Sequence, residues 1–305
     1  DLSVRVRPRG ADALDALMRA FNHMVEELAL SRSRIDYLQR IAGWQEFARR
    51  LAHEIKNPLT PIQLAVQEVA KKYSGDDARF RKTLDTAREV VEEEVATLRR
   101  LVTAFSDFAK LPEVKTAAGD LAEFVRDAAA SRAFLDEAAG EDPGRRAKVE
   151  FVAPDEPIPV MIDRMMLRRA FENLVRNAAQ AIGTREGTIW VRAERHTVEV
   201  AAREGPKPES IDQAWLVVED DGPGIAPEHR AKVFDPYFTT KSEGTGLGLA
   251  IVRKIAFDHD GDVGLEARPG GGARFVITLP LRAAGRAPRL SFVTFSGSSG
   301  RASTT

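Results

Sequence analysis

The stretch EDDGPGIAP, residues 219–227, directly follows the β-branched run WLVV and places two glycines where the chain leaves a predicted strand. Glycine removes side chains at such a point and lets the backbone approach a ligand closely. An acidic group beside bare backbone suits a purine, whose exocyclic amine donates a hydrogen bond while its ring lies on glycine. The turn therefore predicts a purine site at the end of a strand.

A second glycine cluster lies downstream, in EGTGLGLAIVRKIA, residues 243–256, where Gly244, Gly246 and Gly248 lead into a predicted helix. Unpaired N–H groups and the positive end of the helix dipole hold phosphate at such a position. A lone pattern of alternating glycines also serves turns and tight packing, so this cluster is weak evidence when taken alone.

A third stretch, RRAFENLVRNAAQAI at residues 168–182, is a predicted helix that carries Asn173 and Asn177 four residues apart. This spacing puts two carboxamides on one helix face. Together with adjacent Glu172 they suit Mg²⁺, which prefers oxygen ligands. Asparagine pairs are more often plain polar surface, but the Asn helix, the Asp-Gly turn and the Gly-rich helix start occur here in one ordered set.

Around these motifs, β-branched runs and helical stretches follow one another without strict alternation from about residue 115. This pattern predicts an α+β sandwich, in which one sheet carries helices on one face. Residues 203–213 are predicted to form a solvent loop within a long hairpin. The predicted helices cover 120–138, 163–182 and 246–258, and the predicted strands are KVEFV, IPVMI, TIWVRAE, AWLVVED, DVGLEA and ARFVITLP.

Residues 12–110 are almost free of glycine and show helical periodicity, with a turn predicted at YSGDDARF, residues 73–80. Apolar residues recur at steps of three and four, which favours a helical hairpin with bundle packing. Two helices bury little surface, so we expect two copies to form a dimeric antiparallel four-helix bundle. A monomeric helical domain is the alternative.

Composition narrows the function classes. The 305 residues exceed the usual size of one domain, and 43% apolar with 30% charged residues is typical of a soluble protein. A net charge of −1 argues against a general nucleic-acid binder, and zero cysteines exclude disulfides and thiolate metal sites. No run reaches the apolar length of a membrane span. The chain starts without Met, so we expect it to be a piece of a longer protein.

The stretch RRLAHEIKNPLTPIQ, residues 49–63, places His53 off the apolar stripe that includes Ile55. Two residues correspond to a rotation of roughly 200°, so His53 is predicted to face solvent. An exposed imidazole is largely neutral at pH 7 and offers a nucleophilic nitrogen. Glu54 can accept the other ring N–H. Pro58 lacks an N–H, which leaves the carbonyl of Glu54 without its helical partner and weakens the helix there.

These motifs together resemble the boxes of the bacterial two-component sensor histidine kinases, with a wording closest to the nitrogen-regulation branch. LAHEIKNPLTPI resembles the H box, NLVRNAAQA the N box, DDGPGI the G1 box, VFDPYFTT the F box and GTGLGLAI the G2 box. ALDALMRAFNHMVEEL is similar to the second helix of a HAMP module. The resemblance implies a HAMP-like part at 1–34, a dimerisation and phosphotransfer domain at 35–110, a Bergerat-type ATP-binding domain at 115–284 and a disordered tail at 285–305.

The resemblance also implies roles for single residues. His53 would be the phosphoacceptor, Glu54 would orient it, and Asn57 would position a water for a phosphatase reaction. Asn177, Asn173 and Glu172 would hold Mg²⁺. Asp220 would bind the adenine amine of ATP, and the remaining ATP contacts would come from Gly222, Gly224, Phe234, Phe238, Lys241, Gly244, Thr245, Gly246, Leu247 and Gly248.

The implied partners are a second copy of the chain and the receiver domain of a response regulator, with no nucleic acid. A membrane would be reached only through missing N-terminal segments, and the chain would be the cytoplasmic portion of a bacterial inner-membrane protein. Two other functions remain open. An ATPase clamp on the same nucleotide fold would use a glutamate such as Glu172 to activate water, and a scaffold would bind ATP without turnover.

Overall fold

The computed structural model describes residues 13–75, 77–131, 146–200, 209–241, 244–268 and 270–281. Its internal contacts divide the chain into two compact units. One unit contains the chain up to Asp36, residues 114–235 and the chain from Gly248 onward. The other contains residues 37–113 together with 236–247.

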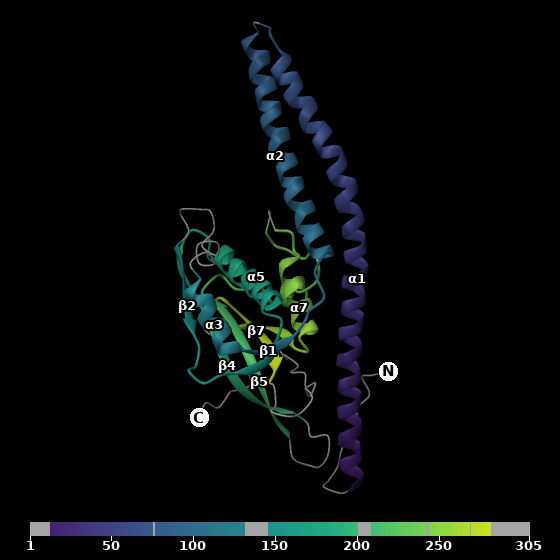
Figure 1. Cartoon of the computed structure of the whole chain (residues 1–305), viewed down its shortest axis with the longest axis vertical. Coiled ribbons are helices and arrows are strands. Elements are labelled where there is room, and N and C mark those ends of the chain that lie inside the picture. Colours follow the sequence, from purple (N-terminus) through teal and green to yellow (C-terminus); the bar gives the residue numbers. More distant parts are fainter. Residues whose placement is uncertain are drawn as a thin grey trace. The chain divides into compact units, whose positions relative to one another are not determined.

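Residues 37–113 of the second unit form a helical hairpin. Helix α1 spans Ala13–Lys72 and helix α2 spans Ala78–Ala109 (Figure 1). Gln67 Nε2 on α1 donates to Glu92 Oε1 on α2 at 2.7 Å, and Gln45 Nε2 donates to the carbonyl of Phe108 at 2.8 Å. The helices are therefore antiparallel, and the turn predicted at 73–80 is confirmed, although α2 already begins at Ala78.

Helix α1 continues through Pro58 and Pro61 without a break. Proline inside a helix removes one backbone hydrogen bond, so the helix is weakened there but not ended. The same helix also joins the segment predicted to be HAMP-like to the phosphotransfer segment. The first twelve residues of the HAMP-like segment lie outside the described residues.

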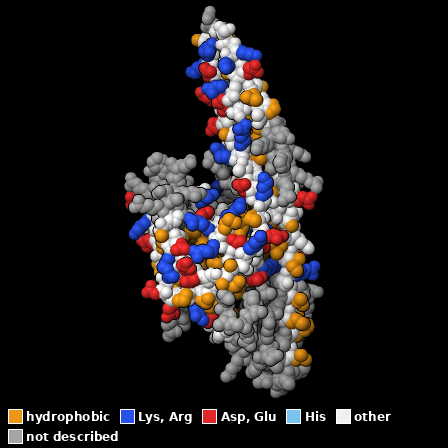
Figure 2. Space-filling model, viewed as in Figure 1, with side chains coloured by type: hydrophobic (Ala, Val, Ile, Leu, Met, Phe, Trp, Pro, Cys, Tyr) orange, Lys and Arg blue, Asp and Glu red, His pale blue; other side chains and the backbone are white. Residues whose placement is uncertain are grey.

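The apolar stripes of the hairpin are only partly covered. Ala48, Leu59 and Val95 are at most 5% exposed, so they hold the two helices together. Farther along the hairpin, Ile62 is 49% and Val69 is 57% exposed. Figure 2 shows hydrophobic side chains among the charged ones on the hairpin surface. A single hairpin therefore leaves apolar surface for a further contact.

The first unit contains a five-stranded sheet with the order β2-β4-β5-β7-β6. Strand β2 pairs with β4 in parallel, and the other neighbours are antiparallel. The bounds are Arg146–Val152 for β2, Glu186–Val200 for β4, Glu209–Asp220 for β5, Asp262–Ala267 for β6 and Ala273–Pro280 for β7.

A separate two-stranded sheet pairs β1, Ala117–Asp120, with β3, Pro159–Ile162. Strand β1 is absent from the sequence prediction because AAGD contains no β-branched or aromatic residue.

Helices α3 (Leu121–Ala130), α5 (Arg164–Ile182) and α7 (Gly248–Asp258) form one layer against the five-stranded sheet (Figure 1). A short helix, α6, spans Pro227–Arg230. Ile189 and Val191 on β4 are fully buried, whereas Arg192 and Glu194 form ion pairs on the other face. The predicted α+β sandwich is confirmed. Helix α3 ends at Ala130, and residues 132–138 of the predicted helix lie outside the described residues. Helix α7 starts at Gly248 rather than 246.

The predicted solvent loop at 203–213 is wrong for its second half. Strand β5 begins at Glu209, which lies opposite Val200 on β4. Arg195 forms an ion pair with Asp212 at 2.6 Å, and the Thr197 hydroxyl donates to the same carboxylate at 2.6 Å. These cross-strand contacts extend the ladder through polar residues that the sequence suggests are loop. Residues 203–208 and the predicted tail at 285–305 lie outside the described residues.

Candidate functional site

Asp220, the last residue of β5, has an almost fully buried carboxylate that is 2% exposed. Its Oδ1 accepts hydrogen bonds from the backbone N–H of Gly222 at 2.8 Å and of Ala273 at 3.4 Å. Burial raises the pKa of the Asp220 carboxyl above its usual range, although these two backbone hydrogen bonds oppose the rise. Both hydrogen bonds end on one oxygen, so neither occupies Oδ2.

Two glycine turns meet behind this carboxylate. Gly272 has a φ of 96°, and a Cβ there would lie 1.8 Å from the carbonyl oxygen of Asp220. Gly224 has a φ of 75°, and its Cβ would lie 2.8 Å from the carbonyl oxygen of Gly272. Only glycine fits both positions, because side chains would clash with backbone and the φ values are left-handed. The Asp-Gly turn therefore packs against the PGGGAR turn.

Asp221 fixes the same turn from the other side. Its Oδ2 accepts the backbone N–H of Thr188 at 3.0 Å, and Arg185 contacts its Oδ1 at 3.1 Å. Both oxygens of Asp221 therefore hold the chain, whereas Asp220 accepts backbone N–H groups through Oδ1 alone.

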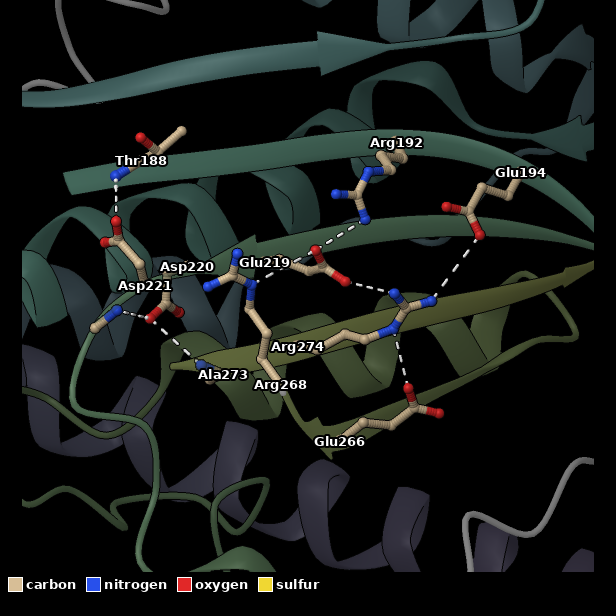
Figure 3. A network of polar contacts seen from close by, with 11 residues as sticks. Thr188, Arg192, Glu194, Glu219, Asp220, Asp221, Glu266, Arg268, Ala273 and Arg274 are labelled. Carbon is tan, nitrogen blue, oxygen red and sulfur yellow. Dashed lines mark hydrogen bonds and ion pairs between the residues drawn. The ribbon is translucent and has the colours of Figure 1, made fainter. Parts of the chain in front are cut away.

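A polar network that the sequence prediction missed lies next to Asp220 (Figure 3). Glu219 is 5% exposed, and it is ion-paired with Arg192 at 2.8 Å and with Arg274. A buried carboxylate needs such partners. The ion pairs of Glu219 therefore hold the end of β5. Successive strand residues point to opposite faces of the sheet, so Asp220 points to the helix side. The available signal was the period-two recurrence of charge at Arg192 and Glu194.

The carboxamides of α5 lie at the start of α7. A Cβ on Gly248 would be 3.3 Å from Asn173 Oδ1 and 3.7 Å from Asn177 Nδ2. The Asn173 Nδ2 group donates to the carbonyl of Arg169 at 2.9 Å, which orients its oxygen. The structure therefore brings the predicted asparagine pair and the predicted phosphate-binding helix start together. Glu172 is paired with Arg168 at 2.9 Å, a contact that a metal ion would have to replace.

Within the part of the chain that the structure describes, no cluster of three or more His, Cys, Asp or Glu side chains could hold a metal ion. The oxygen donors at Asn173 and Asn177 nevertheless fit Mg²⁺, which usually binds one or two protein groups and completes its shell with phosphate and water. The residues present are thus suited to a metal that arrives with a nucleotide.

Two further predicted residues lie near α7 or in the segment before it. Phe234 is 8% exposed and packs against Phe275 with ring centroids 6.3 Å apart. Leu247, just before α7, is 1% exposed, and its N–H donates to Thr245 Oγ1 at 3.4 Å.

Residues 236–247 belong to the unit of the helical hairpin. The Lys241 N–H donates to Thr239 Oγ1 at 3.0 Å, and the Gly244 N–H donates to the carbonyl of Lys241 at 3.3 Å. Phe238 is half-buried in this segment. The Tyr237 N–H donates to the carbonyl of Gly246 at 3.0 Å, which closes the segment into a loop.

Tyr237 is a residue that the sequence prediction missed. Its ring lies 4.8 Å from Trp44 and 5.1 Å from Phe105, between the two helices of the hairpin. Its φ of 66° is unusual for a bulky side chain.

His53, Glu54 and Asn57 lie in α1, and their side chains are outside the description. The helical backbone places Asn57 one turn after His53. Nearby, Ile55 is half-buried and Leu59 is 5% exposed, as the predicted stripe requires.

Two family models match this chain. Residues 44–113 match the His Kinase A (phospho-acceptor) domain, and residues 162–283 match the histidine kinase-, DNA gyrase B- and HSP90-like ATPase. The first match contains His53, and the second contains Asp220, the asparagine pair and the glycine turns. The chain belongs to the sensor histidine kinase family.

Several curated proteins are similar to this chain. The nitrogen regulation protein NtrY of Azorhizobium caulinodans is 34% identical over 256 residues, which are 81% of this chain and 30% of that protein. The putative sensor histidine kinase NtrY-like of Rickettsia conorii is 30% identical over 285 residues, 92% of this chain and 44% of that protein. The resemblance to the nitrogen-regulation branch is confirmed, and the chain spans less than half the length of these relatives.

Among solved structures, the chain is similar to the mycobacterial sensor histidine kinase MprB, with 26% identity and a TM-score of 0.41. That likeness covers 56% of this chain and 100% of the other. No helix among the described residues of the kinase is both long and apolar enough to cross a membrane.

Proposed function

We propose that this histidine kinase phosphorylates itself on His53 from Mg-ATP and passes the phosphoryl group to an aspartate of a response regulator. The observation that carries the proposal is the convergence of Asn173 and Asn177 on Gly248 at the start of α7, in a unit that also holds buried Asp220. The ATPase-type family match supports ATP as the nucleotide.

Each part of the nucleotide has a matching group. Asp220 accepts a hydrogen bond from the adenine amine through Oδ2, the oxygen that the N–H groups of Gly222 and Ala273 do not use. The N-terminus of α7 offers backbone N–H groups to phosphate. Lys241 and the glycines of residues 244–248 act as a lid over the phosphates. Asn177, Asn173 and Glu172 would hold Mg²⁺, which would offset charge on the phosphates.

His53 supplies the nucleophile. A neutral ring nitrogen forms a bond to the γ-phosphorus while the bond from that phosphorus to the β-γ bridging oxygen breaks and ADP leaves. Glu54 accepts the hydrogen bond of the other ring nitrogen and supports the positive charge that develops. The phosphoryl group then moves from His53 to a carboxylate of the receiver domain, and neutral histidine is restored.

Labelling with γ-³²P-ATP tests this proposal. His53→Ala should abolish labelled protein and leave ADP affinity within about two-fold, because His53 does not take part in nucleotide binding. Asn177→Ala should lose both Mg-ATP affinity and labelling. Undiminished labelling of the His53 variant would show that the phosphoacceptor lies elsewhere.

The ATPase clamp predicts a different result. In that case phosphate would be released from ATP without labelling His53, and Glu172→Gln would stop the release. The ion pair between Glu172 and Arg168 would have to open in either case, for Glu172 to activate water or to bind Mg²⁺, so the labelling of His53 decides between the two functions.

The partners follow from the same proposal. A second copy of the chain would cover the exposed stripe of the hairpin, and a receiver domain would dock near His53. The HAMP-like role of residues 1–34 and the place of the chain as the cytoplasmic portion of a bacterial inner-membrane protein stay predictions.

A further inference from the structure

His259 is a buried side chain that joins the end of α7 to the beginning of α5. It is 3% exposed, and its Nε2 lies 2.9 Å from the backbone nitrogen of Asp163. The Asp163 N–H donates, so Nε2 must be the acceptor. The hydrogen of the neutral ring is therefore on Nδ1, which donates to the carbonyl of Ile255 at 2.7 Å. Both ring nitrogens are used, one toward each helix.

The partner of His259 is held firmly. The Asp163 side chain caps α5 by accepting the N–H groups of Met165 and Met166, both at 3.1 Å. Its other oxygen accepts the N–H of Lys115 at 3.0 Å. Because three other hydrogen bonds fix Asp163, the bond to His259 ties the end of α7 to a rigid point at the first turn of α5.

The other end of α7 lies at the predicted phosphate site. Helix α7 starts at Gly248, beside Asn173 and Asn177, and it ends at Asp258, just before His259. Helices α5 and α7 are therefore antiparallel neighbours that meet near both ends of α7. A slip of one residue would move one helix by about 1.5 Å along the other.

We propose that His259 is a positioning residue that sets the register of α7 on α5, and so places the phosphate-binding start of α7 opposite the asparagine pair. This inference rests on the proposed function, because it assumes that phosphate and Mg²⁺ bind between Gly248 and Asn177. An error of about 1 Å at such a site can lower the rate by about a hundred-fold. Asp220 lies at the end of β5, so adenine recognition does not depend on this register.

Two ligands can test the phosphate half of the site, at Gly248 and Asn177, separately from the adenine half, at Asp220, in the full chain. Mg-ADP uses the phosphate half and the adenine half, and it is measured by calorimetry. Adenosine uses the adenine half alone, and it is measured by NMR titration.

Two carboxamide variants form a matched pair. In His259→Gln the side-chain oxygen still reaches the Asp163 N–H, whereas in His259→Asn the side chain is one methylene too short. We expect His259→Asn to bind Mg-ADP at least ten-fold more weakly than wild type and His259→Gln to stay within about three-fold. Adenosine affinity should change by less than two-fold in both variants.

Val263→Ala is the control for simple destabilisation, because Val263 is a 4% exposed core residue of β6 that contacts neither ligand half. Its ratio of Mg-ADP to adenosine affinity should equal that of wild type. If His259→Asn does not fold by circular dichroism, His259→Phe, which fills the ring volume without an acceptor, replaces it.

The proposal is overturned if His259→Asn and His259→Gln bind Mg-ADP equally, if both ligands weaken in parallel, or if neither His259→Asn nor His259→Phe folds. A wild-type chain that binds no Mg-ADP would instead refute the proposed function.

Discussion

At Asp220, burial disfavours the charged carboxylate, whereas backbone hydrogen bonds favour it. Its carboxylate is 2% exposed and accepts two backbone N–H groups, yet burial keeps its pKa raised. Native Asp220 therefore takes up a proton at a higher pH than it does in the unfolded chain. The buried charge lowers the free energy of unfolding by its full amount above the raised pKa. This destabilisation disappears as the pH falls from the raised pKa of the folded state to the ordinary pKa of the unfolded chain.

Asp220→Asn should therefore separate stability from binding. Asparagine keeps Oδ1 for Gly222 and Ala273 but places an N–H₂ group where the adenine amine would donate. We expect at least ten-fold weaker ADP binding, about 1.4 kcal/mol. At pH 7 the unfolding midpoint should equal or exceed that of wild type, and any excess should shrink at acidic pH. A lower midpoint at pH 7 would contradict this account.

Asn57 should separate the kinase from a phosphatase activity. It lies one turn after His53 on α1, where a carboxamide can hold a water in line with the aspartyl phosphate of a docked receiver. Asn57→Ala should keep His53 labelling within a few-fold and slow loss of phosphate from the regulator ten-fold or more. The assay follows purified phospho-regulator with ADP and each variant. Equal decay with wild type and variant would rule out this role.

At the scale of elements, residues 236–247 form a loop that the aromatic ring of Tyr237 anchors between α1 and α2. The Tyr237 hydroxyl is buried and has no hydrogen-bond partner among the described residues. Burial also raises the pKa of Tyr237. The ring thus stabilises the contact while the hydroxyl weakens it.

Tyr237→Phe should strengthen this contact, because removing an unsatisfied buried hydroxyl recovers about 1 kcal/mol. Tyr237→Ala should loosen it, because the ring contacts with Trp44 and Phe105 are lost. The melting temperature should be highest for Tyr237→Phe, intermediate for wild type and lowest for Tyr237→Ala. The fluorescence emission of Trp44 should shift to the red only in Tyr237→Ala. Trp190→Phe and Trp215→Phe in all samples isolate the Trp44 signal. An Ala variant as stable as wild type would show that the ring does not anchor the loop.

At the scale of the whole molecule, the exposed apolar stripe predicts a dimer. Leu98 is 38% and Phe80 is 49% exposed on α2, whereas Val95 and Val102 of the same stripe are buried. Leu98→Glu should give a monomer, since a charge on the stripe would be buried without a partner. Glu93→Lys, about 200° away from Val91, should leave the dimer intact. Light scattering at micromolar concentration reads the mass, and a wild-type monomer would contradict the prediction.

Much of this architecture was predictable because its causes are local. A three-four apolar period marks a helix in any context, and alternating β-branched residues mark a strand. Gly224 and Gly248 were identifiable as positions of close approach, because the absence of a side chain can be read directly from the sequence. The hairpin turn was also predictable, since Asp77 caps α2 through groups two and three residues away.

The tertiary structure alone decided which distant residues act together. His259 meets Asp163 across 96 residues, and Arg274 meets Glu219 across 55. Neither pair can be found until the order of strands and the register of helices are known, because each side chain has many partners of suitable chemistry in the sequence. Tyr237 is the third case, since its role depends on two helices that only the folded hairpin brings together. The sequence by itself determined the chemistry of the site, and packing determined what holds that chemistry in place.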